Sequence, residues 1–158
     1  MSSSDVSGET TAQVESALGV DMSLEVVTLP VADVDRSKAF YQSLGWRLDI
    51  DLVVSDEVRT VQFTPPHSGC SIQFGKGRTA AEPGSSEAMI LVVKDIDAAR
   101  DDLINRGVDV SEVQEMKPPG FDAPGRSYFA RASFSDPDGN GWELQEITTR
   151  LPGRTWED

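Results

Sequence analysis

Few side chains in this sequence can act as nucleophiles, acid–base groups or strong metal ligands. Its 158 residues include one histidine, His67, and one cysteine, Cys70. His67 stands in a Pro-Pro-His-Ser-Gly turn and fits an exposed turn residue better than an acid or base at a cavity mouth. Cys70 has no basic neighbour in the sequence that would favour its thiolate, so we expect an inert, half-buried thiol. A site of two histidines and one carboxylate cannot be built within this chain.

Composition and motifs exclude several classes of function. The formal net charge of -13 argues against nucleic acid and anionic membranes as partners, because both attract basic patches. No apolar stretch approaches the roughly 20 residues of a membrane span, and no secretory signal is visible. We find no nucleotide-binding glycine loop, no Ser–His–acid set and no zinc-finger spacing. The single cysteine rules out an internal disulfide and predicts a cytoplasmic protein.

An internal repeat indicates how the chain positions its side chains. Asp33 and Gly45 recur at one constant offset as Asp95 and Gly107. Each copy begins with a β-branched and aliphatic run, its Asp fits a helix N-cap, and its Gly fits the residue that ends a helix. Three short β-like runs follow each helix. The order β-α-β-β-β in both copies predicts an α+β fold of two modules around one core.

The predicted boundaries follow from this repeat. The chain is divided into a disordered acidic N-terminal tail (1–21), a single domain (22–147) and a C-terminal tail (148–158). The domain is divided into module one (22–75), a linker (76–86) and module two (87–147). The strands expected after the two helices are 46–53, 58–64 and 70–74 in module one, and 108–113, 128–135 and 141–147 in module two.

Three segments resemble those of a known superfamily. Residues 29–46 resemble the first strand and helix of glyoxalase-like proteins, residues 92–108 the start of their second module, and residues 134–144, with Asp-Pro-Asp-Gly-Asn, their final hairpin. In this order and at this spacing they resemble the vicinal oxygen chelate superfamily of glyoxalase, bleomycin-resistance and dioxygenase-like proteins, over about 23–146. The resemblance implies two half-barrels whose concave faces surround a cavity, and a homodimer.

The resemblance also implies four positions at which the family holds a metal ion. They fall on Val26 and Ala88 in the first strand of each module, and on Gln73 and Glu143 in the fourth. Val26 and Ala88 have no donor atom, and Gln73 and Glu143 alone would hold a divalent ion weakly. We therefore expect no catalytic metal and no other cofactor.

Strand parity extends the predicted cavity wall, because alternate residues of a strand share a face. The expected ligand-binding residues on the strands are Val26, Thr28, Ser71, Gln73, Ala88, Ile90 and Gln145. Residues 115–126 read either as an ordinary surface loop or as a lid carrying Phe121, with Arg126 and Tyr128 reaching the ligand. A mostly apolar wall with a few amides and hydroxyls suits a small organic molecule.

Two functions of different classes remain open. One is a metal-independent protein that sequesters a small organic molecule, as the bleomycin-resistance branch does with bulky cationic drugs. The other is a metal-independent isomerase, lyase or epoxide-opening hydrolase with Glu143 as general base. Glu143 also has a non-catalytic explanation, as a carboxylate that is hydrogen-bonded to Gln73 or to water. A third interpretation is a relic of the family that associates with another protein.

Overall fold

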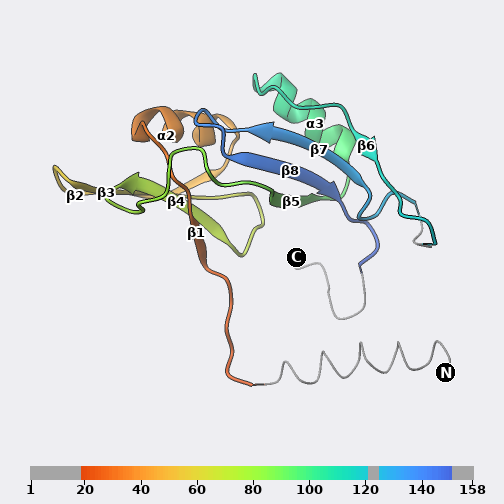
Figure 1. The fold of residues 1–158 in the computed structure, drawn as a ribbon, viewed down its shortest axis with the longest axis horizontal. Coiled ribbons are helices and arrows are strands. Elements are labelled where there is room, and N and C mark those ends of the chain that lie inside the picture. Colours follow the sequence, from red (N-terminus) through yellow and green to blue (C-terminus); the bar gives the residue numbers. More distant parts are fainter. Residues whose placement is uncertain (1–18, 121–124, 151–158) are drawn as a thin grey trace.

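The computed structural model describes residues 19–120 and 125–150 and contains two four-stranded sheets (Figure 1). Module one consists of β1 (Val26–Thr28), α2 (Val34–Ser43), β2 (Arg47–Ser55), β3 (Val58–Thr64) and β4 (Ser71–Lys76). Module two consists of β5 (Met89–Val93), α3 (Ile96–Asn105), β6 (Gln114–Glu115), β7 (Ala130–Ser135) and β8 (Gly141–Glu146). The predicted order of elements and the α+β class are confirmed. Most of both predicted tails, 1–18 and 151–158, lies outside the described residues.

The two sheets share one topology. Sheet A has the order β1-β4-β3-β2 and sheet B the order β5-β8-β7-β6. In each, the first strand runs parallel to the last and the remaining pairs are antiparallel. Helix α2 packs against β3 and β4, and α3 packs against β7 and β8. Each helix therefore covers one face of its sheet and leaves the other face open.

Both helices begin and end where the repeat predicts. The carboxylates of Asp33 and Asp95 each accept a hydrogen bond of 3.0 Å from the backbone N–H three residues further on. Gly45 and Gly107 follow the helices with φ of 81° and 88°. Only glycine adopts this left-handed conformation without strain, so these two residues stop the helices.

One apolar core joins the two modules. Every second residue of the central strands is buried toward the helices: Val61, Phe63, Ile72, Phe74, Ala132, Phe134, Trp142 and Leu144. Tyr41 of α2 is fully buried, and its ring centroid lies 5.4 Å from that of Trp46 and 6.2 Å from that of Trp142. Because Trp142 belongs to module two, the aromatic cluster connects both modules.

A buried polar network reinforces this junction. The Asp136 carboxylate, in a residue 5% exposed, accepts hydrogen bonds from the Tyr41 hydroxyl and the Asn140 side-chain amide, both at 2.8 Å. The Trp142 indole donates to the Tyr41 oxygen at 3.0 Å, and the Asn140 amide also donates to the Pro30 carbonyl at 2.9 Å. Burial, followed by the Asp136 charge, raises the pKa of Tyr41 far above its usual range. The Tyr41 hydroxyl therefore stays protonated and donates to Asp136.

The strand expected at 108–113 is wrong. Val108 and Val110 are buried in the core, but this segment is irregular and β6 covers only two residues. Ser111 holds the segment beside β7: its backbone N–H donates to the Ser133 carbonyl, and its hydroxyl accepts from the Ser133 N–H, both at 2.9 Å. Val108 and Val110 alternate because both pack on the core from an irregular segment. No regular strand forms there, since the Ser111 hydroxyl takes the Ser133 N–H that a neighbouring strand would otherwise bond.

Ion pairs hold the β2–β3 hairpin against α2. Arg59 donates to Asp51 at 3.0 Å and to Asp35 at 2.8 Å, and Lys38 donates to Asp51 at 2.7 Å. The hydrogen bonds from Arg59, and then from Lys38, lower the pKa of Asp51 to about 2. The carboxylate of Asp51 is therefore more acidic in the folded chain than in the unfolded one.

This shift predicts a loss of stability in acid. A lowered folded-state pKa contributes stability above the unfolded pKa of about 4, and that contribution is lost as the pH falls toward about 2. We expect Asp51→Asn to reduce the decline of the unfolding free energy over this window, measured by urea denaturation at a series of pH values. Asp101→Asn, an exposed aspartate of α3, is the matched control. Equal declines in the wild type and Asp51→Asn would contradict the assignment.

Candidate functional site

Strand register defines the open face of each sheet, the one away from its helix. On sheet A, Thr28 and Gln62 both pair with Gln73. On sheet B, Ile90 and Ser133 both pair with Glu143. By the same pairing, the open face of sheet A carries Val26, Thr28, Ile50, Leu52, Gln62, Ser71 and Gln73, and that of sheet B carries Ile90, Arg131, Ser133, Ser135, Glu143 and Gln145.

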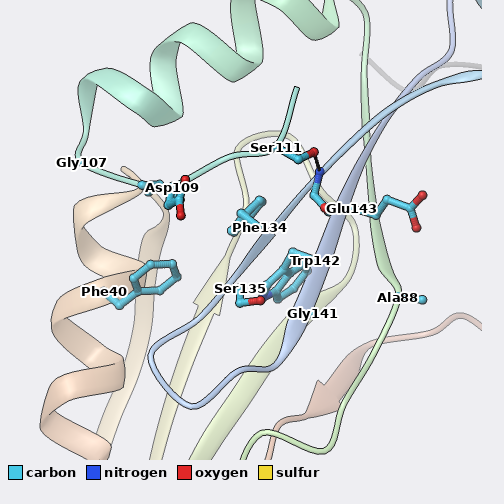
Figure 2. A pocket seen from close by; sticks show the side chains of 12 residues that line it. Phe40, Ala88, Gly107, Asp109, Ser111, Phe134, Ser135, Gly141, Trp142 and Glu143 are labelled. Carbon is cyan, nitrogen blue, oxygen red and sulfur yellow. Dashed lines mark hydrogen bonds between the residues drawn. The ribbon is translucent and has the colours of Figure 1, made fainter. Parts of the chain in front are cut away.

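A hollow of about 600 Å³ borders sheet B and reaches its open face at Ser133, Ser135 and Glu143 (Figure 2). Its wall combines apolar residues, polar residues and two glycines: Phe40, Ala88, Val108, Phe134 and Trp142; Asp109, Ser111, Ser133, Ser135 and Glu143; Gly107 and Gly141. Phe40 comes from α2 of module one and lies at the opposite end from Ala88 and Glu143. The hollow therefore crosses the sheet and ends at the junction of the modules. Its volume falls within the roughly 300–1,000 Å³ of ligand pockets.

Glu143 lines this hollow and is ion-paired. Its side chain is 24% exposed, and its Oε1 accepts a hydrogen bond from the Arg131 guanidinium at 3.1 Å. Glu143 and Arg131 also line a smaller hollow of about 200 Å³, which continues along the sheet past Met116. The pair occupies one of the two oxygens with which a general base would take a proton. Glu143 therefore presents an ion-paired carboxylate to both hollows.

The alternative in which the Glu143 carboxylate is bonded to Gln73 is wrong. The Gln73 side-chain amide donates to the Thr28 hydroxyl at 2.8 Å, on the open face of sheet A, whereas Glu143 stands on sheet B. The two residues hold equivalent positions in the repeat but belong to different sheets. Each finds its partner within its own sheet.

The four positions that the resemblance assigns to a metal do not form a set of donors. Val26 and Ala88 have hydrocarbon side chains, and the Gln73 amide is bonded to Thr28. Within residues 19–120 and 125–150, no three side chains of His, Cys, Asp or Glu come together as a metal site. The residues present therefore do not fit a catalytic metal of the kind that this position would hold.

The structure brings only part of the predicted wall together. Ala88 and Glu143 line the larger hollow, and Ile90, 48% exposed, stands on the same open face. Neither hollow includes a residue of sheet A, where the other four predicted positions lie: Val26, Thr28, Ser71 and Gln73. Gln145, on the same open face, is buried, donates to the Tyr128 carbonyl at 3.1 Å and lines neither hollow.

Of the three residues predicted for a lid, two bond to residues away from the hollows and one is outside the described residues. Arg126 is ion-paired with Asp97 of α3 at 2.8 Å and with Glu115 at 3.0 Å. The Tyr128 backbone N–H donates to the Glu146 carbonyl at 2.7 Å, which fixes this residue at the end of β8. Phe121 is outside the described residues. Through its ion pair with Asp97, Arg126 stabilises the start of α3. It does not line either hollow.

His67 and Cys70 lie apart from the hollow. His67 is exposed in its turn with a φ of 62°. Cys70 is half-buried, and burial, followed by the nearby Glu25 carboxylate, raises the pKa of its thiol. A raised pKa keeps the sulfur protonated and poorly nucleophilic. Neither residue supplies chemistry to the hollow.

Sequence reasoning missed the serines that line the hollow. Ser133 and Ser135 alternate along β7 with Ala132 and Phe134, and only the latter two are buried. This period-two pattern was available in the sequence, and it places the serines in phase with Glu143. Phe40 gave no such signal, because its place in the wall depends on how the modules meet.

No helix in the part of the chain that the structure describes is long and apolar enough to span a membrane.

Comparisons with known proteins agree with the topology. Residues 23–144 match the family model of the Glyoxalase/Bleomycin resistance protein/Dioxygenase superfamily. TnmS3, an antibiotic binding protein from Streptomyces sp. CB03234, is 27% identical over 82% of this chain and 99% of its own, with a TM-score of 0.66. A glyoxalase/bleomycin resistance protein from the same organism is 29% identical over 78% and 99%, with a TM-score of 0.61. A member of the superfamily from Sphaerobacter thermophilus DSM 20745 is 26% identical over 81% and 99%, with a TM-score of 0.63. No curated protein matches the chain.

Proposed function

Because this chain belongs to the Glyoxalase/Bleomycin resistance protein/Dioxygenase superfamily, we propose that it binds a small organic molecule on the open face of sheet B and needs no catalytic metal. The hollow of about 600 Å³ that reaches that face carries the proposal. The antibiotic-binding TnmS3, 27% identical, supports a bulky ligand of the antibiotic type. The lack of donors at Val26 and Ala88 supports binding without a metal.

The chemistry of the wall favours a cationic ligand with hydrogen-bonding groups. Asp109 and Glu143 provide carboxylates, and Ser133 and Ser135 provide hydroxyls. Among the described residues that line the larger hollow, none is basic. The net charge of -13 attracts cations to the whole surface. The ring of Phe40 adds an apolar end to the hollow.

We further propose that the protein is a cytoplasmic homodimer. Ile50, Leu52 and Ile90, on the two open faces, are 43%, 54% and 48% exposed. A second copy that set its sheet A opposite this sheet B would cover these side chains and enclose the ligand. The lone Cys70 suits a reducing compartment.

The proposal is tested by calorimetric titration and native mass spectrometry with a panel of bulky antibiotics that includes bleomycin. We expect one saturable site per chain, with the same affinity before and after dialysis against EDTA. Binding that requires an added divalent metal would contradict the metal-free site. Saturation by none of the panel, together with no small molecule retained through purification, would contradict the binding function.

Glu143→Gln is expected to lower the affinity for a cationic ligand about fivefold. This corresponds to a loss of roughly 1 kcal/mol of binding free energy for a partly exposed charge. The substitution removes the carboxylate and leaves Arg131 facing the ligand without its partner. Calorimetric titration measures the change. Glu112→Gln, an exposed residue outside both hollows, is the control.

The same variant tests the alternative enzyme. Suppose that the wild type converts a bound compound to product. If Glu143→Gln still binds that compound but does not convert it, Glu143 is a general base. The protein would then be a metal-independent isomerase, lyase or epoxide-opening hydrolase. Affinity that is unchanged in Glu143→Gln, with no turnover in either protein, would remove Glu143 from the site altogether.

A further inference from the structure

The last residue of β7 lacks the neighbour that its counterpart in module one has. In sheet A, β2 pairs with β3 from one end to the other, and Arg47 lies opposite Thr64, the last residue of β3. In sheet B, β6 reaches only the first two residues of β7. Ser111 takes the next position along this edge through its two hydrogen bonds with Ser133. No residue of 19–120 or 125–150 pairs with Ser135 from that side.

The backbone N–H and C=O of Ser135 point to this outer edge. Along a strand these groups alternate between the two neighbours, so Ser135 directs them to the same side as Ser133, which bonds to Ser111. Asp136, the next residue, directs its N–H to the other side, where it donates to the Asn140 carbonyl at 3.0 Å. Ser135 therefore offers one donor and one acceptor that no described residue occupies.

The larger hollow lies where a longer β6 would run. Residues 107–109 line it on the side of α3, and residues 133–135 line it on the side of β7. Figure 2 shows Gly107 and Asp109 apart from Ser135, with Phe134 between them. The unpaired backbone groups of Ser135 therefore open into the hollow that carries the proposed function. Apolar neighbours such as Val108 and Phe134 strengthen a hydrogen bond made there, because they lower the local dielectric constant.

The length of the free edge limits what can pair with it. Ser111 closes the edge on one side, and on the other side Pro137 has no N–H and lies in the turn to β8. A strand of another protein would need several successive pairs, for which this edge has no room. One residue of a small molecule needs only the N–H and C=O of Ser135.

We propose that the outer edge of β7 is a subsite for one acylated amino-acid residue of the ligand. Its N–H donates to the Ser135 carbonyl and its C=O accepts from the Ser135 N–H, as in a bonded pair of antiparallel strands. Asp109 lines the same hollow and has no ion-pair partner among the described residues, so it offers a carboxylate to a cationic side chain. This inference rests on the proposed function and narrows its ligand to peptide-like molecules.

The probe is N-acetyl-L-lysine N′-methylamide, a single cationic residue with an amide on each side. It is titrated into the full chain, and the backbone amides are followed by heteronuclear NMR. We expect a saturable downfield shift of the Ser135 N–H, because an amide proton moves downfield when it donates. The control probe carries a methyl group on its α-nitrogen. It is expected to bind about tenfold more weakly, because the Ser135 carbonyl loses its donor.

Two variants test the same bonds from the side of the protein. Ser135→Pro removes the N–H at an edge position, where proline costs no bond of the sheet. It is expected to bind the lysine probe about tenfold more weakly. Ser135→Ala keeps the backbone N–H and loses only the hydroxyl, so its affinity is expected to stay within about twofold of the wild type. If Ser135→Pro does not fold, the two probes decide on the wild type alone.

The outcomes separate the subsite from the function. Equal affinities of the two probes for the wild type overturn the subsite, and so do equal losses in Ser135→Pro and Ser135→Ala. A shift of the Ser135 N–H that grows with protein concentration in the absence of probe also overturns it, because a second copy would then occupy the edge. If an antibiotic binds in calorimetry and leaves the Ser135 N–H unmoved, the subsite is wrong and the binding function stands. If the lysine probe pairs with Ser135 and no antibiotic binds, the subsite stands and the antibiotic type of ligand is wrong.

Discussion

Replacing Asp136 with alanine is expected to lower the free energy of unfolding by about 3–5 kcal/mol, because each buried donor left without an acceptor costs about 1–3 kcal/mol. The Asp136 carboxylate accepts from the Tyr41 hydroxyl and from the Asn140 amide, and it also accepts two backbone N–H groups of the turn that follows. The Asn140 amide keeps the Pro30 carbonyl as a second acceptor, so it loses least. Tyr41 is fully buried, so its hydroxyl has no access to bulk solvent in place of Asp136.

The loss is measured by urea and thermal denaturation. For a chain of this size, about 3–5 kcal/mol corresponds to a fall of roughly 6–20 °C in the melting temperature. Asp136→Asn, which keeps the shape and one acceptor oxygen, is expected to lose less than half as much. Asp101→Ala, on the exposed side of α3, is expected to stay within about 0.5 kcal/mol of the wild type. A loss below about 1 kcal/mol in Asp136→Ala would show that the network does not hold the modules together.

Features decided by neighbouring residues were predictable from the sequence. Asp33 and Asp95 cap their helices because the carboxylate needs only an N–H three residues on. Gly45 and Gly107 end the helices because their backbone conformation excludes other residues. The strand expected at 108–113 failed because alternating burial of Val108 and Val110 has two causes, pairing in a sheet or packing on a core. A single sequence does not distinguish them.

The candidate site was less predictable, because it depends on how separate elements meet. Strand parity joined Thr28 to Val26 and Ser71 to Gln73, and the strand register pairs Val26 with Ser71 and Thr28 with Gln73. Parity does not say how one sheet stands relative to the other, so the sequence suggested one wall where a single chain has two open faces. The ion pair of Glu143 with Arg131 depends on the register of β7 against β8. The residues of these two strands do not predict that register. Phe40 enters the wall only through the packing of α2.

Ser133→Trp is expected to weaken ligand binding more than about hundredfold, a loss of roughly 2.7 kcal/mol or more. Ser133 is exposed in the middle of β7, pairs with Glu143, and lines both hollows, so an indole at this position fills the space that the ligand would take. Fold stability is expected to change little, because the position faces outward and tryptophan is well tolerated in strands. Calorimetric titration with the tightest antibiotic of the panel measures the effect. Asn105→Trp, at the exposed end of α3, is the control.

Gln62→Trp decides which sheets hold the ligand. Gln62 pairs with Gln73 as Ser133 pairs with Glu143, so it is the equivalent position on the open face of sheet A. If Ser133→Trp abolishes binding and Gln62→Trp does not, the ligand contacts sheet B alone. If both variants lose binding and remain dimeric, the ligand lies between sheet B of one copy and sheet A of the other, because neither hollow of a single chain reaches Gln62. Full binding by Ser133→Trp would contradict the site on sheet B, whatever the result for Gln62→Trp.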